Sequence, residues 1–108
     1  SRESASIYIA YGLIKLGYNI KIYDPLVSRS RILNDLLSLC KKNNEVSETC
    51  IEENINIYDD LSNIISNSKI LTVLTECNEF LKLEHLKDTH VIFDFRNFIN
   101  HDLVKMRL

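Results

Sequence analysis

The sequence predicts an α/β protein in which an open parallel sheet is flanked by helices. Short runs rich in β-branched and apolar residues recur along the chain, and segments with helically spaced apolar residues separate them. Strands that alternate with helices in this way form parallel sheets through right-handed crossovers. The 108 residues suit one domain of ordinary size, so residues 1–108 are expected to form a single domain.

The first helix is expected over Ser1–Lys15, with Ser4 as its cap and Gly17 as its C-terminal stop. Its apolar stripe consists of Ile7, Tyr11 and Ile14. The alternating segment Asn19–Tyr23 then predicts a strand. Asp24-Pro25 ends this strand, because the residue before a proline is disfavoured in the helical region and the pair marks a turn.

A second helix is predicted from Ser30 to about Lys42. Its broad apolar face consists of Ile32, Leu33, Leu36, Leu37, Leu39 and Cys40. The polar, irregular residues 42–54 predict a loop. A short strand is expected at Ile55–Tyr58, and a helix starting at Asp59-Asp60 should turn Leu61, Ile64 and Ile65 inward.

The apolar run Lys69–Leu74 predicts a strand that is buried on both faces. Polar residues follow it at 75–80, and a short helix or two turns are expected at Leu81–Asp88. Val91–Asp94 predicts the next strand. A last helix is expected over His101–Arg107.

With the strands numbered as they occur along the chain, we predict that they lie side by side in the sheet in the order 2-1-3-4. This order gathers Asp24, Thr75-Glu76 and residues 94–97 at one edge of the sheet. In open α/β sheets, ligands bind outside the carboxyl ends of the strands. Arg96 lies directly after a strand, where its guanidinium can grip an anion such as phosphate, although a surface salt bridge is the alternative interpretation. The acids Asp24, Glu76 and Asp94 are interpreted as loop organisers rather than catalysts.

The composition argues against several classes of partner. The net charge is −2 and the basic residues form no stripe, which argues against nucleic-acid and membrane-surface binding. No apolar run has membrane-spanning length. Cys40, Cys50 and Cys77 are odd in number and lack metal-site spacing, so we expect reduced thiols in a cytoplasmic protein and no metal site. With only two glycines, any phosphate is expected to be held by side chains and helix N-termini.

Four segments together resemble one family. These are SRES at residues 1–4, IYDPLV at 22–27, LTECNEF at 74–80 and FDFRNF at 93–98. They resemble the C-terminal, UDP-binding domain of the UDP-glucose/GDP-mannose dehydrogenases, especially of the members that act on UDP-glucose. The resemblance covers most of the chain except about residues 43–53, and it implies a Rossmann-like sheet. Because the chain begins at Ser1 rather than at a methionine, we expect it to be a piece of a longer protein.

The resemblance implies a role in oxidising the C6 alcohol of UDP-glucose to the carboxylate of UDP-glucuronate, with two NAD⁺ consumed. In the family, an N-terminal domain binds NAD and supplies the catalytic cysteine, and a central helix mediates dimerisation, so the full-length protein is expected to be a homo-oligomer. This chain would be the cap that holds the UDP end of the substrate. No catalytic residue is therefore expected in it, and alone it should be inactive.

Two arginines match the family's binding residues. The resemblance implies that Arg96 contacts the nucleotide-sugar substrate and that Arg2 reaches the NAD diphosphate. The sequence departs from the family at Phe95, where glycine is usual, and at Cys77, where tryptophan is usual. It also stops at Leu108, before the family's last, glycine-phenylalanine strand. We expect Phe95 to have a negative φ and Arg96 to point toward the strand ends.

Two alternatives remain. One is a stand-alone interaction module of flavodoxin-like topology, such as a phospho-receiver, but Asp24 is followed by Pro25, and Thr75 stands where an acceptor aspartate is needed. The other is a degenerate domain kept only for assembly, which the departures at Phe95 and Cys77 leave open.

Overall fold

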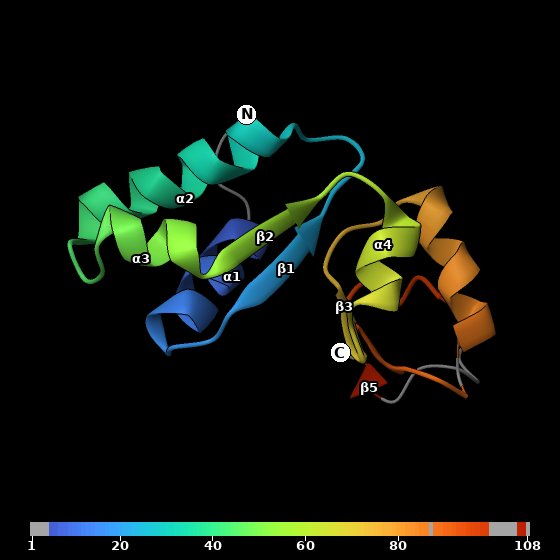
Figure 1. Cartoon of the computed structure of the whole chain (residues 1–108). Coiled ribbons are helices and arrows are strands. Elements are labelled where there is room, and N and C mark those ends of the chain that lie inside the picture. The colour runs from blue at the N-terminus through green and yellow to red at the C-terminus, as the bar shows by residue number, and fades with distance from the viewer. Residues whose placement is uncertain (1–4, 87, 100–105, 108) are drawn as a thin grey trace. The chain divides into compact units, whose positions relative to one another are not determined.

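The computed structural model describes residues 5–86, 88–99 and 106–107, in which helices and strands alternate as the sequence predicts (Figure 1). The chain forms two units, Ser1–Ile64 and Ile65–Leu108. Each unit has a sheet of its own, and all strand pairs are parallel. The predicted α/β class with parallel strands is confirmed.

The first unit begins with helix α1 (Ala5–Lys15), which ends as the glycine predicts. Gly17 has a φ of 98°, which suits a residue without a Cβ atom. Its N–H donates to the carbonyl of Ile14 at 2.9 Å, and the N–H of Tyr18 donates to Leu13 at 3.0 Å. These two hydrogen bonds form a Schellman motif, which satisfies the last carbonyls of the helix.

Helix α2 (Arg29–Asn43) matches the predicted second helix. The hydroxyl of Ser28 caps its start by accepting from the N–H of Arg31, and Asn44 ends it in the left-handed conformation, with a φ of 54°. The predicted loop over residues 42–54 is wrong in part, because Glu48–Glu53 form the short helix α3. Ser47 caps this helix by accepting from the N–H of Cys50 at 3.0 Å.

The core of this unit forms where α1, α2 and α3 pack together. Its most deeply buried side chains are Ile14, Leu36, Leu39 and Ile51. Strands β1 (Ile20–Tyr23) and β2 (Ile55–Tyr58) pair in parallel, with Ile20 opposite Ile55 (Figure 1). The isoleucines of both strands pack against the helical core, while Lys21 between them is exposed. This alternation is typical of a sheet covered on one face.

Helix α4 (Leu61–Ser66) begins where the sequence predicts. The carboxylate of Asp60 accepts from the N–H of Ser62 at 2.7 Å and so caps the helix start. Leu61 and Ile64 are buried, as expected, and Ile65 is half-buried.

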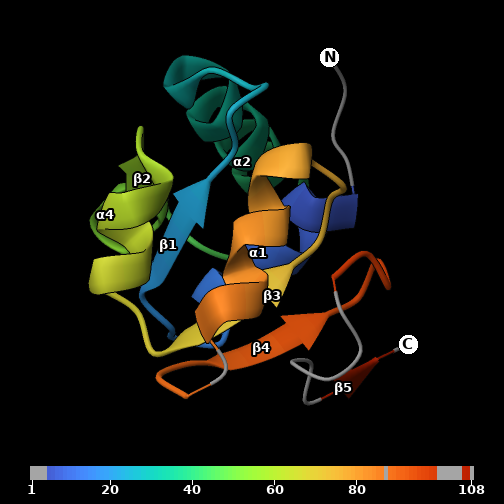
Figure 2. The same ribbon diagram turned by 90° about the vertical axis from the view of Figure 1, so that its right-hand side faces the viewer.

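The second unit contains strands β3 (Ile70–Val73), β4 (Val91–Asp94) and β5 (Met106–Arg107), with β4 in the middle (Figure 2). The 3₁₀ helix η1 (Asn78–Leu86) connects β3 to β4 and starts earlier than the predicted helix. The helix predicted at His101–Arg107 is wrong for Met106–Arg107, which pair with β4 instead. Residues 101–105 lie outside the described part of the chain.

The expectation that β3 is buried on both faces is also wrong. Leu71 and Val73 are buried, but Ile70 is 62% exposed and Thr72 is exposed. Neighbouring side chains of a strand point to opposite faces, so the apolar run alone does not show how many faces are covered.

Two links of the predicted strand order are confirmed. The first and second predicted strands are paired as β1 and β2, and the third and fourth as β3 and β4. The remaining link, between the strands at Ile20–Tyr23 and Ile70–Val73, would join the two units and stays a prediction.

Candidate functional site

The candidate site lies at the carboxyl end of β4, where a buried carboxylate organises the following turn. Asp94 is fully buried. Its Oδ1 accepts from the N–H of Arg96 at 3.0 Å, and its Oδ2 accepts from Phe98 at 2.7 Å and Ile99 at 2.6 Å. Burying a charge is costly unless hydrogen bonds replace its water, and three backbone donors do so here. Asp94 therefore organises the loop after β4, as predicted.

Arg96 and Glu76 meet across the ends of two neighbouring strands. Val73 pairs with Asp94, so the segments after β3 and β4 leave the sheet at the same edge. Nη2 of Arg96 donates to Oε2 of Glu76 at 3.3 Å. Both side chains are about half exposed, at 51% each. The pair is thus a solvated ion pair at a strand-end position, where α/β sheets commonly bind ligands.

The backbone at Phe95 is unstrained. Among the described residues other than glycine, only Asn44 and Asn97 have a positive φ, so Phe95 does not. Its N–H donates to the carbonyl of Val73 at 3.1 Å, which extends the parallel ladder by one residue. The left-handed conformation is taken by Asn97, with a φ of 58°, and asparagine tolerates it better than most residues. The expectation that Phe95 has a negative φ is confirmed.

The Arg96 side chain was expected to point toward the strand ends, and this expectation is confirmed in part. Its guanidinium contacts Glu76, which follows the exposed Thr75 in the segment after β3. Asp24 belongs to the other unit, where its Oδ1 accepts from the N–H of Leu26 at 2.8 Å and organises the turn at Pro25. The gathering of Asp24 with Glu76 and Arg96 at one edge stays a prediction. Arg2 lies outside the described residues.

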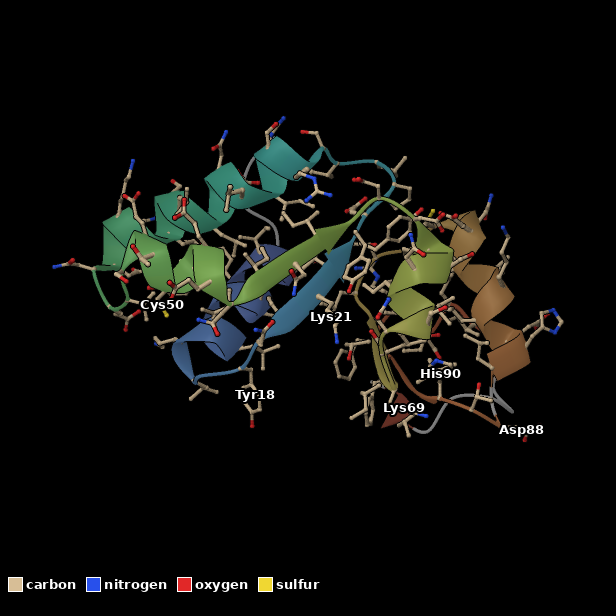
Figure 3. All side chains as sticks on the ribbon, viewed as in Figure 1. Tyr18, Lys21, Cys50, Lys69, Asp88 and His90 are labelled. Carbon is tan, nitrogen blue, oxygen red and sulfur yellow. The ribbon has the colours of Figure 1, made fainter. Side chains whose placement is uncertain are left out.

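The cysteines are free thiols in different settings. Cys40 is buried in the first unit, and its Sγ donates to the carbonyl of Val46 at 2.8 Å. Burial raises the pKa of the Cys40 thiol, so it is a poor nucleophile. Cys50, labelled in Figure 3, and Cys77 are half-buried. Within the described part of the chain, no three His, Cys, Asp or Glu residues form a group that could hold a metal ion.

One anchoring residue was not found from the sequence. The Nε2 atom of His90 lies 3.0 Å from the carbonyl oxygen of Ile65 at the end of α4, and Nδ1 lies 2.7 Å from the hydroxyl of Thr89 (Figure 3). Since a carbonyl can only accept, Nε2 carries the proton. His90 therefore ties the start of β4 to α4 and has a structural role. No local sequence signal indicates this, because Ile65 lies 25 residues away.

Comparison with known proteins identifies the family. Residues 1–101 match the UDP-binding domain of the UDP-glucose/GDP-mannose dehydrogenase family. The chain belongs to this family. The match includes the strand ends that carry Glu76 and Arg96, so these residues lie in a domain whose family description names UDP as its ligand.

Two curated relatives support the same assignment. The chain is 27% identical to a UDP-glucose 6-dehydrogenase of Caenorhabditis elegans over 97% of its length, and 26% identical to one of Drosophila melanogaster over 94%. It spans about a fifth of each relative, 22% in both cases. Among the described residues, no helix has both the length and the apolar character needed to cross a membrane.

Proposed function

We propose that this chain is the UDP-binding domain of a dehydrogenase that oxidises UDP-glucose to UDP-glucuronate with two NAD⁺. Membership of the family supports the nucleotide, and the names of the two relatives support the sugar. In this proposal the chain works within a longer, homo-oligomeric protein, whose NAD-binding domain and catalytic thiol lie outside these 108 residues. The chain alone is expected to be inactive.

The observation that carries the proposal is the position of Arg96 after β4. A guanidinium has five N–H donors in a planar fork, which matches the oxygens of a diphosphate. Glu76 contacts the guanidinium through one nitrogen, and the Arg96 side chain is about half exposed. An anion can therefore approach the guanidinium from solvent.

The described residues contain no glycine-rich turn of the kind that holds a dinucleotide. A dinucleotide cradle needs glycines in a turn that leads from a strand into a helix. Gly12 lies inside α1, and Gly17 lies between a helix and a strand. We therefore propose that NAD is held mainly by the other domain, and that Arg2 contributes a contact to its diphosphate.

The proposal is tested by titrating UDP into the full-length protein by calorimetry. Arg96→Ala should weaken UDP binding by about 1.5–3 kcal/mol, the usual value of a hydrogen bond to a charged group. Lys41→Ala is the matched control, because Lys41 is an exposed cation paired with Glu48 near the C-terminal end of α2, away from the strand ends. Its affinity for UDP should equal that of the wild type.

The reaction is tested with the same preparation. UDP-glucose and NAD⁺ should yield two NADH for each sugar nucleotide consumed. A wild-type protein that binds no UDP would support the assembly-only alternative. Equal UDP affinity in the wild type and in Arg96→Ala would reduce Arg96 to a surface salt bridge.

A further inference from the structure

Glu76 and Arg96 form a contact between two strand ends that are distant in the sequence. The two residues are 20 positions apart in the sequence, and each lies just beyond the end of a strand. Pairing of β3 with β4 brings them together. Neither residue is needed for the core, because both side chains are about half exposed.

Arg96 is restrained both at its backbone and at the end of its side chain. Its backbone N–H is held by the buried carboxylate of Asp94 at 3.0 Å. The remaining freedom lies in the long side chain, and Glu76 contacts the far end of that side chain. A side chain that is already restrained loses less conformational entropy when a ligand binds.

The contact also leaves the guanidinium able to bind. Oε2 of Glu76 engages Nη2 alone, rather than gripping the fork through two parallel hydrogen bonds. A phosphate can then approach the other N–H groups while the ion pair persists. The negative charge of Glu76 opposes a diphosphate, but exposure and salt screen this repulsion.

We propose that Glu76 is a positioning residue, which holds the guanidinium of Arg96 in place to receive the diphosphate of a nucleotide. The inference rests on the proposed function of Arg96 and adds a second residue to the same site. It assigns a role to the glutamate beyond the loop-organising one expected from the sequence.

The test compares UDP affinity in full-length variants at physiological salt. Glu76→Ala should weaken UDP binding about two- to fivefold, the range expected for an exposed ion pair. Glu76→Gln should lie closer to the wild type than Glu76→Ala does, because its amide oxygen can still accept from Nη2. Glu52→Ala, which removes an exposed glutamate of α3, should not change the affinity.

A double variant shows whether Glu76 acts through Arg96. In the Arg96→Ala background, Glu76→Ala should cause no further loss of affinity. A further loss there, or UDP binding by Glu76→Ala that equals or exceeds that of the wild type, would overturn the inference. If the wild type binds no UDP, the proposed function fails, and if Arg96→Ala binds UDP normally, the role assigned to Arg96 fails. If only Glu76→Ala binds normally, the positioning role alone fails.

Discussion

The carboxylate of Asp94 accepts a hydrogen bond from the backbone N–H of Ile99, with Oδ2 and N 2.6 Å apart. This bond closes the turn that begins at the end of β4 and carries Arg96. Ile99 is itself buried, so the turn is fixed by a hydrogen bond and by packing at the same residue. The segment presenting the candidate binding arginine is therefore well anchored.

Asp94→Asn should lower the free energy of unfolding by about 1–3 kcal/mol. The amide is neutral and can accept at only one of its two ends, so at least one backbone N–H among Arg96, Phe98 and Ile99 loses its acceptor. Urea unfolding measures the change. Asp88→Asn, at an exposed position of the same unit, is the control and should be neutral. Wild-type stability in Asp94→Asn would contradict the anchoring role.

Phe95→Gly should destabilise the protein more than Phe95→Ala, by about 0.5–1 kcal/mol. Both variants remove the half-buried ring, and only glycine adds backbone freedom. Because Phe95 has no positive φ, glycine relieves no strain there. Chemical denaturation of the two variants measures the difference. The opposite order, with glycine more stable than alanine, would indicate a strained backbone at this position.

Arg96→Lys should restore only part of the UDP affinity that Arg96→Ala loses. Lysine supplies the charge, but a single ammonium group cannot present a planar fork to a diphosphate and to Glu76 together. Calorimetry on the three full-length proteins should rank them as arginine, then lysine, then alanine. A lysine variant that binds as tightly as the wild type would show that charge alone is sufficient.

Tyr11 should make the stability of the protein fall at high pH. Burial raises the pKa of its phenol, and the nearby Glu45 carboxylate, which accepts its hydrogen bond at 3.3 Å, raises it further. Above about pH 10 the unfolded chain loses this proton while the folded chain keeps it, so stability decreases as the pH rises. Below that pH the stabilisation is fully present.

Tyr11→Phe removes this titration, so its unfolding midpoint should fall less between about pH 9 and 11 than that of the wild type. Urea unfolding at several pH values measures the slope. Tyr18→Phe is the control, because Tyr18 is 59% exposed, and it should keep the wild-type slope. An unchanged slope in Tyr11→Phe would show that another group controls alkaline unfolding.

Local signals predicted much of the secondary structure because they act within a few residues. Gly17 ends α1 through its own backbone freedom, and Asp60 caps α4 through an adjacent hydrogen bond. Helix α3 was missed because its six residues are too few to show a helical period, although Ser47 offers a cap. The strand Met106–Arg107 was missed because two residues form a strand only through a partner, here β4.

The sequence by itself determined the alternation of strands and helices, the parallel pairing within each unit, and Arg96 as the candidate binding residue. These follow from periodicity, from end signals and from the family resemblance. The tertiary structure alone decided that the exposed face of β3 includes Ile70, that His90 anchors β4 to Ile65, and that Glu76 pairs with Arg96. The reason is physical. Such contacts join residues distant in sequence, and they exist only after paired strands and packed helices bring those residues within a few ångströms of each other.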